Sequence, residues 1–333
     1  MSPEPLAART GGTVVLETDF CGDVDDVAAL ALLCAEARRH ADAFRLGGVS
    51  CNVASPFTAP AVKAVLAAFG LQDVPVGVTD DPPPPSGNES SYLAALAATW
   101  RGAEGGRFVE ASLPCMTAAA VSSGRDAPTA RPHPATACSA HELYRRVFAE
   151  AADGSVDVIS IGFFNTLDEV LADSPALFRR KVRAVWAMAG GFARCAGYAE
   201  TNVRERPEAS RRFLDAWDGP IVFVGFESGD KVITDLSGLP PECGAHPLVE
   251  AFRRYCGLSM KRPSWDPITV DFAVHGENDC YELGEPGRVR VAPDLSTPFA
   301  SDPAGNARVL RLRAPEDAVS ARITSLLRRA AGL

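Results

Sequence analysis

Short apolar runs alternate with segments of helical periodicity along the first part of the chain. The runs TVVLET, FRLGGVSC and VPVGVT have the length and the β-branched content of buried strands. Between them, apolar positions recur at helical spacing over residues 27–40 and 58–70. This βαβαβ order predicts a parallel sheet, because parallel neighbours need a helical crossover.

The same alternation resumes after residue 138. It predicts a helix to about residue 152 and strands over VDVISIGF, VRAVWAMAG and PIVFVGF, separated by helices ending near residue 171 and covering 207–217. The last third predicts helices near 247–255 and 267–274, strands near 288–291 and 308–312, and a closing helix. The predicted fold class is therefore α/β, with one doubly wound, mostly parallel sheet and helices on both faces. Such sheets bind ligands at the carboxyl ends of their strands.

The pattern predicts a single domain over residues 13–333 after a disordered N-terminal tail at 1–12. Two stretches, at about 80–90 and 101–137, are rich in Gly, Pro, Ser and Ala and lack a sustained period. We expect them to form long loops, as a mobile rim or lid.

The composition of the chain argues against some kinds of binding partner. The net charge of −9 argues against nucleic acid, because phosphate binding needs a basic face. The N-terminus lacks the features of a secretory signal, and no segment reaches about 18 apolar residues, so we expect a cytoplasmic protein without a membrane partner. Nine cysteines without a CxxC pair indicate reduced thiols. A homo-oligomer is compatible with this composition.

An acidic stretch, LETDFCGDVDDVAAL, follows the first predicted strand and holds Glu17, Asp19, Asp23, Asp25 and Asp26. Helix capping explains one or two of these carboxylates. A hard divalent cation explains more of them, because close carboxylates repel one another unless a cation or shared protons intervene. The spacing excludes an EF-hand, and an aspartyl phosphatase loop would need an aspartate where Glu17 stands.

The stretch TDFCGDVDDVAAL resembles the N-terminal signature of the inosine-uridine-preferring nucleoside hydrolase family, DxDPGxDDAxAL, and most closely a variant branch reading TDxGxDxDDAxAL. Four further segments resemble the family in the same order: LGGVSCNVASPFTAPAVKAVLAAFGLQDVPVGV, ISIGFFNTLDEVL, MAGGFARCAGYAETNVRERPEA and RPSWDPITVDFAVHG. The similarity spans about residues 13–276 and implies a nucleoside-hydrolase-like fold.

The resemblance also implies a calcium site and a small-molecule ribosyl substrate. Asp19, Asp26 and Asp266 would coordinate Ca²⁺ through their carboxylates, and the backbone carbonyl of Asn165 would add a fourth protein ligand. The cation would hold the ribose hydroxyls and the attacking water. Asp19, as a ligand carboxylate, could accept the proton of that water.

Further residues are implied to act on the substrate. Catalytic roles fall to Asp19, Asp25 and Asn52. The residues implied to contact the substrate are Asp25, Met188, Glu200, Asn202, Trp265 and Asp266.

The sequence departs from the family pattern at several places. Asp23 has no counterpart in the main branch, Arg194 replaces a frequent asparagine, and Asn165 and Thr166 are swapped relative to the family's turn. Trp265 stands where many purine-cleaving members carry a leaving-group histidine. We expect His275 to be structural, and the other four histidines give no functional signal.

The favoured hypothesis is calcium-dependent hydrolysis of a ribosyl N-glycosidic bond, most simply that of a nucleoside, releasing free base and ribose. One alternative is a hydrolase of a modified ribosyl or other N-glycoside, since Arg194 could meet an anionic group. The other is a catalytically silent, calcium-containing binder of a nucleoside or sugar. The sequence leaves the base preference and the leaving-group acid undetermined.

Overall fold

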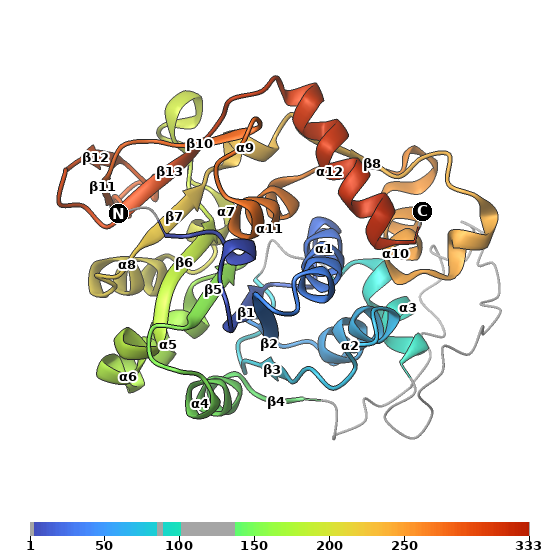
Figure 1. Ribbon diagram of the computed structural model, residues 1–333, viewed down its shortest axis with the longest axis horizontal. Coiled ribbons are helices and arrows are strands. Elements are labelled where there is room, and N and C mark those ends of the chain that lie inside the picture. The colour runs from blue at the N-terminus through green and yellow to red at the C-terminus, as the bar shows by residue number, and fades with distance from the viewer. Residues whose placement is uncertain (1–2, 85–88, 101–136, 333) are drawn as a thin grey trace.

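A mostly parallel sheet forms the centre of the molecule (Figure 1), in a computed structural model that describes residues 3–84, 89–100 and 137–332. Its strand order is β12-β11-β13-β7-β6-β5-β1-β2-β3-β4, and β10 pairs with β13. The parallel strands are β1 (Gly12–Thr18), β2 (Phe44–Cys51), β3 (Val76–Val78), β4 (Cys138–Ser139), β5 (Val156–Ser160), β6 (Val182–Met188), β7 (Ile221–Val224) and β13 (Ala307–Leu312). The predicted fold class is thus confirmed.

The remaining strands are antiparallel and short. β10 (Tyr281–Leu283), β11 (Gly287–Val289) and β12 (Phe299–Ser301) extend one edge of the sheet, and β8 (Ile233–Asp235) pairs with β9 (Lys261–Pro263) in a separate ribbon. Among these, only β11 lies in a stretch where the sequence predicts a strand. All five have only three residues, but the alternating run RVRV at 288–291 makes a period of two visible at β11.

Helices cover both faces of the sheet because the buried strands alternate their side chains between two cores. In β1, Val14 and Leu16 belong to one core, and Val15 belongs to the other. The first core takes residues from α1 (Asp25–Arg39), α2 (Thr58–Ala68), α3 (Ser91–Thr99), α10 (Pro247–Cys256), α11 (Trp265–His275) and α12 (Glu316–Ala330). The second takes residues from α4 (Ala140–Glu150), α5 (Asn165–Asp173), α6 (Pro175–Lys181) and α8 (Pro207–Ala216).

The order of the strands creates a crevice beside β1. From β1 the chain runs outward through β2, β3 and β4, and then returns to the opposite side of β1 to form β5 and β6. The order in which strands are added to the sheet therefore reverses between β1 and β5, although the two strands are parallel neighbours. The loops that follow their carboxyl ends lead to opposite sides of this point. This reversal is where doubly wound folds bind ligands.

The segment before β1 lies against the fold. Leu6 is fully buried, and an Arg9 guanidinium nitrogen lies 2.6 Å from a carboxylate oxygen of Asp157 in β5. The sequence predicts this segment as part of a disordered tail. Of the two predicted long loops, residues 85–88 and 101–136 lie outside the described residues. Within the described part of the chain, no helix is both long and apolar enough to cross a membrane.

Candidate active site

Loops from the carboxyl ends of β1, β5 and β6 enclose a cavity of about 190 Å³. Two short helices, α7 (Thr201–Arg204) and α9 (Phe226–Gly229), and the start of α11 complete its walls. The lining residues are Asp19, Asp23, Asp25, Asp26, Ile161, Met188, Glu200, Thr201, Asn202, Phe226, Arg262, Trp265 and Asp266. The cavity thus brings together eight of the ten predicted site residues, and only Asn52 and Asn165 are not among its lining.

Three aspartates form the most compact cluster of the cavity. Asp25, Asp26 and Asp266 each offer a carboxylate oxygen, and these atoms lie within 4.8 Å of one another. All three side chains are buried, and all three lie in the first turn of a helix, α1 or α11. The positive ends of two helix dipoles therefore meet at the cluster and partly offset its negative charge.

The two dipoles do not suffice to keep three buried carboxylates charged. Burial raises the pKa values of Asp25, Asp26 and Asp266 well above the usual range, and the neighbouring carboxylates raise them further. A divalent cation would reverse both effects by favouring the ionised forms. Because the donors are all oxygen atoms, the cluster fits a hard cation such as Ca²⁺ or Mg²⁺.

Asp19 lines the same cavity but does not belong to the trio. Burial raises the pKa of Asp19 to about 7, and Asp23, Glu200 and Glu205 add to the rise. The backbone of Asp19 lies very close to Gly162, in the loop after β5. A Cβ atom at position 162 would lie 2.4 Å from the backbone nitrogen of Asp19. Only glycine permits this approach.

Arg262 is a cavity residue that the sequence did not reveal. Its Nε donates to Asp23 Oδ1 at 2.9 Å, and a second nitrogen donates to Asp23 Oδ2. The guanidinium also lies 5.3 Å from the ring centroids of Trp265 and Tyr255. Arg262 therefore neutralises Asp23, which explains how one extra carboxylate is accommodated beside the trio.

Glu200, Asn202 and Met188 line the same cavity from α7 and β6. Glu200 accepts backbone hydrogen bonds from Asn202 at 2.9 and 3.0 Å and from Gly190 at 3.1 Å, and burial raises its pKa to about 7. Asn202 Nδ2 donates to the carbonyl oxygens of Met188 at 2.9 Å and Ile161 at 3.3 Å. The amide thus ties the ends of two strands to this wall.

Trp265 and Phe226 form an aromatic wall. Their rings stack with centroids 5.4 Å apart, and Tyr198 adds a further ring 4.7 Å from Phe226. The indole Nε1 of Trp265 donates to the carbonyl oxygen of Phe226 at 2.9 Å. The wall therefore presents ring faces, and the one polar hydrogen of Trp265 is already bound.

Asn52 and Asn165 are not among the residues that line the cavity. Asn52 Nδ2 donates to the Phe163 carbonyl oxygen at 2.8 Å, and Asn165 Nδ2 donates to Asp81 Oδ2 at 2.6 Å and to the Asn52 carbonyl oxygen at 3.1 Å. These bonds connect the loops that follow β2, β3 and β5. Asn165 is the first residue of α5.

Arg194 lies in a different, neighbouring cavity of about 540 Å³. It pairs with Glu316 at 3.1 Å and donates to the carbonyl oxygen of Glu227 at 2.7 Å. The structure therefore does not bring Arg194 into the cavity of the aspartates.

Comparison with solved structures agrees with this architecture. An inosine-uridine preferring nucleoside hydrolase from Bacillus anthracis superposes with a TM-score of 0.64 at 18% identity, covering 96% of this chain and 99% of that one. A plant nucleoside hydrolase, PpNRh1, gives 0.60 at 18% identity, covering 96% and 98%. The type III effector protein XopQ, solved with adenosine diphosphate ribose, gives 0.65 at 15% identity, covering 98% and 97%. No protein-family model and no curated protein sequence matches the chain. The fold of this chain is that of the nucleoside hydrolases.

Proposed function

We propose that this protein hydrolyses the N-glycosidic bond of a ribosyl compound, in the first place a nucleoside, with the help of a divalent cation. The observation that carries the proposal is the buried trio of Asp25, Asp26 and Asp266 at the sheet reversal of a nucleoside hydrolase fold. Buried carboxylates this close together are costly without a cation. A cation in this place would face a cavity with room for a small ligand.

Calcium is the cation that we propose, on the ligand set Asp19, Asp26, Asp266 and the carbonyl oxygen of Asn165, with Asp25 within reach. When bound, it would hold ribose hydroxyls and make a water molecule more acidic. Asp19 is the carboxylate that we assign to proton acceptance, because it lines the cavity beside the trio.

The walls of the cavity suit the two halves of a nucleoside. Glu200 and Asn202 offer polar groups on one side, suited to sugar hydroxyls, and Met188 lies beside them. Trp265 and Phe226 offer ring faces on another side, on which a planar base can stack. We assign Asn52 to a supporting role behind Asp19, on the evidence of its bond to Phe163.

A second candidate is a protein that binds a ribosyl compound, or cleaves a modified one, without turning over ordinary nucleosides. Two observations favour it. Trp265 lacks a free acidic proton for a departing base. In addition, the structural neighbour XopQ was solved with adenosine diphosphate ribose, which is a ribosyl compound other than a simple nucleoside.

Product analysis separates these candidates. The protein is incubated with Ca²⁺ and a panel of nucleosides, and free base and ribose are quantified by chromatography. We expect base release that stops in Asp26→Asn and persists in Asp218→Asn, which changes an exposed aspartate paired with Arg179. Ribose binding without release of any base would reject nucleoside hydrolysis in favour of the binder.

A further inference from the structure

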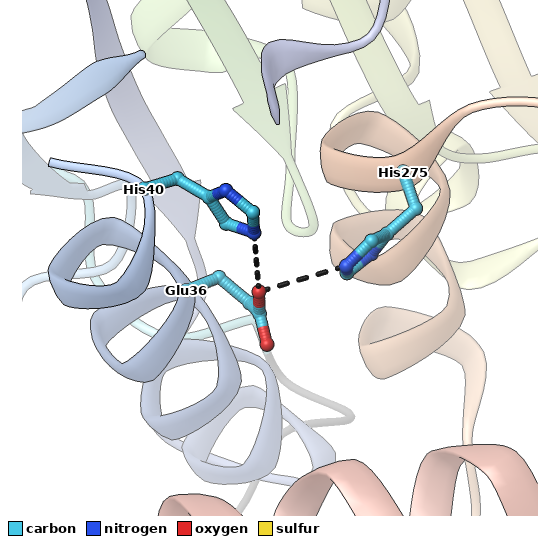
Figure 2. A group of neighbouring side chains, drawn as sticks. All are labelled: Glu36, His40 and His275. Atoms are coloured by element: carbon cyan, nitrogen blue, oxygen red, sulfur yellow. Dashed lines mark ion pairs between the residues drawn. The ribbon is translucent and has the colours of Figure 1, made fainter. Parts of the chain in front are cut away.

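A second cluster of metal-binding side chains lies at the far ends of the helices that carry the aspartates. Glu36, at the last turn of α1, meets His40 just beyond that helix and His275 at the end of α11 (Figure 2). At 1.5 Å per residue, this cluster is roughly 14–16 Å along the helices from Asp25 and Asp266. It is therefore separate from the cavity described above.

Glu36 points an unsatisfied oxygen between the two imidazole rings (Figure 2). Its side chain is 2% exposed, and among the described residues its Oε2 has no hydrogen-bond partner. Nε2 of His40 lies 3.2 Å from this oxygen, and Nε2 of His275 lies 3.6 Å from it. Charge-assisted N–H···O bonds are shorter, at about 2.7–2.9 Å, so neither distance is typical of a strong hydrogen bond.

The tautomer of His275 is fixed from the opposite side of its ring. Nδ1 of His275 lies 2.9 Å from Asp271 Oδ1, and Asp271 is fully buried. Arg322 donates to both oxygens of Asp271, at 2.7 and 2.8 Å, and the Tyr281 hydroxyl donates at 2.8 Å. Asp271 is thus held as an acceptor, and the proton of a neutral His275 belongs on Nδ1.

The lone pair of Nε2 in His275 then faces the unsatisfied oxygen of Glu36. Two acceptors facing each other need a proton or a metal cation between them, and a metal can bind both rings and the carboxylate at once. A carboxylate that orients a histidine through Nδ1, so that Nε2 is free to ligate, is the usual support of a histidine bound to a metal.

We propose that Glu36, His40 and His275 form a binding site for a transition-metal dication of the Zn²⁺ class. Ligand bonds of about 2.0–2.2 Å at tetrahedral angles separate ligand atoms by roughly 3.3–3.5 Å, close to the distances observed here. His40 and His275 are 27% and 24% exposed, which leaves a fourth position for water. Imidazole nitrogen selects Zn²⁺ over the hard cations that suit the aspartate trio.

The bound metal would clamp α1 to α11 at their C-terminal ends. Between this cluster and the aspartate trio at their N-terminal ends, the two helices pack through apolar side chains of one core. A metal bound by residues of both helices would add a direct link between their C-terminal ends. This proposal does not depend on hydrolase activity, and its test uses binding alone.

The test is titration of the metal-free full-length protein with Zn²⁺ by calorimetry, in the presence of excess Ca²⁺, and with Co²⁺ by visible absorption. We expect one Zn²⁺ per chain with micromolar or tighter affinity, and a Co²⁺ spectrum typical of four ligands. His40→Gln and His275→Gln should each weaken binding by at least about 100-fold. His141→Gln is the matched control, because His141 also faces a single carboxylate, that of Glu169 at 3.2 Å, and has no second histidine beside it among the described residues.

Two outcomes would overturn the proposal. One is Zn²⁺ binding that is equally strong in the wild type and in both folded variants, since the site would then lie elsewhere. The other is a wild type that binds Zn²⁺ no more tightly than millimolar, which would leave a shared proton as the link between Glu36 and the two rings. Circular dichroism checks folding, and two independent variants keep the test decisive if one of them unfolds.

Discussion

Trp265 lines the cavity, and in the reaction that we propose its indole cannot donate a proton to a departing base. The N–H group already donates to the carbonyl oxygen of Phe226, and the rest of the ring carries no proton that an indole can give up. A general acid contributes about 10²- to 10⁴-fold to such reactions. The identity of this one residue therefore bears directly on substrate choice.

We predict that kcat/KM for para-nitrophenyl riboside exceeds that for inosine by at least about 100-fold, because only the first leaving group departs without protonation. Trp265→His should raise the rate for inosine and narrow the ratio. Trp265→Phe, which keeps a ring but gains no acid, should leave the ratio unchanged. Equal rates for both substrates in the wild type would mean that another residue donates the proton.

Glu17 predicts a pH dependence of stability. It is buried in β1, accepts a hydrogen bond from the Tyr144 hydroxyl at 2.7 Å, and has its pKa raised to about 8 by burial, against 4.5 in an unfolded chain. Because the folded-state pKa is the higher one, the stabilising contribution is complete below pH 4.5 and is lost as the pH rises through 8.

Glu17→Gln should remove this loss. Between pH 6 and pH 9, we expect the free energy of unfolding of the wild type to fall by roughly 2–3 kcal/mol more than that of the variant, at about 1.4 kcal/mol per pKa unit. Urea unfolding at several pH values measures the difference, and Glu150→Gln, at an exposed position, is the control. Parallel pH profiles for the wild type and Glu17→Gln would contradict the assignment.

At the scale of elements, the site depends on helices that begin where strands end. Asp25 and Asp26 open α1 directly after the loop from β1. Asp266 is the second residue of α11, before Pro267, a residue that the first turn of a helix tolerates. Each carboxylate is therefore placed by a rigid helix rather than by a flexible loop. Asp19, in contrast, lies in the loop after β1, and Gly162 approaches its backbone closely.

Gly162→Ala should disturb this contact. Its Cβ atom would meet the Asp19 nitrogen at 2.4 Å and the Thr18 carbonyl carbon at 2.8 Å, so the loop must move. We expect at least about a 10-fold loss of Ca²⁺ affinity, because ligands displaced by an ångström coordinate poorly. Gly22→Ala lies in the same acidic loop with nothing within 4 Å, and it should bind Ca²⁺ like the wild type in calorimetric titration.

The same elements explain what the sequence could and could not predict. Strands such as β1 and β6 were predictable because burial on both faces gives continuous apolar runs. β9 was not, because its three residues, Lys261–Pro263, comprise two charged residues and a proline and show no period. Arg262 in this strand binds Asp23 across 239 residues of sequence, so no local pattern links them. No local pattern indicates that His40 and His275 meet either, because their meeting depends on how α1 packs on α11.

At the scale of the whole molecule, cation binding should control stability. Without a cation, the trio of Asp25, Asp26 and Asp266 has raised pKa values, so the metal-free protein should lose stability as the pH rises from 5 to 8. With Ca²⁺ at about 100 times its dissociation constant, the free energy of unfolding should rise by about 2.7 kcal/mol, which raises the Tm by several degrees.

Differential scanning calorimetry at pH 5 and pH 8 measures this effect. Ca²⁺ should raise the Tm more at pH 8 than at pH 5, and it should have little effect on Asp26→Asn. A Tm that does not respond to Ca²⁺ at either pH would exclude a calcium site in the trio.

The wide separation of the ligands along the chain has a consequence for folding order. The backbone nitrogen of Asp266 donates to Oδ2 of Asp25 at 3.4 Å, and the two residues are 241 positions apart in the chain. The ribosome must release the chain as far as the start of α11 before the two can meet, and contacts between such distant segments form slowly. The strands from β1 to β7 can assemble earlier, with acidic loops still exposed to water. Cation capture would then be among the last steps of folding, and refolding yields should rise when Ca²⁺ is present from the start.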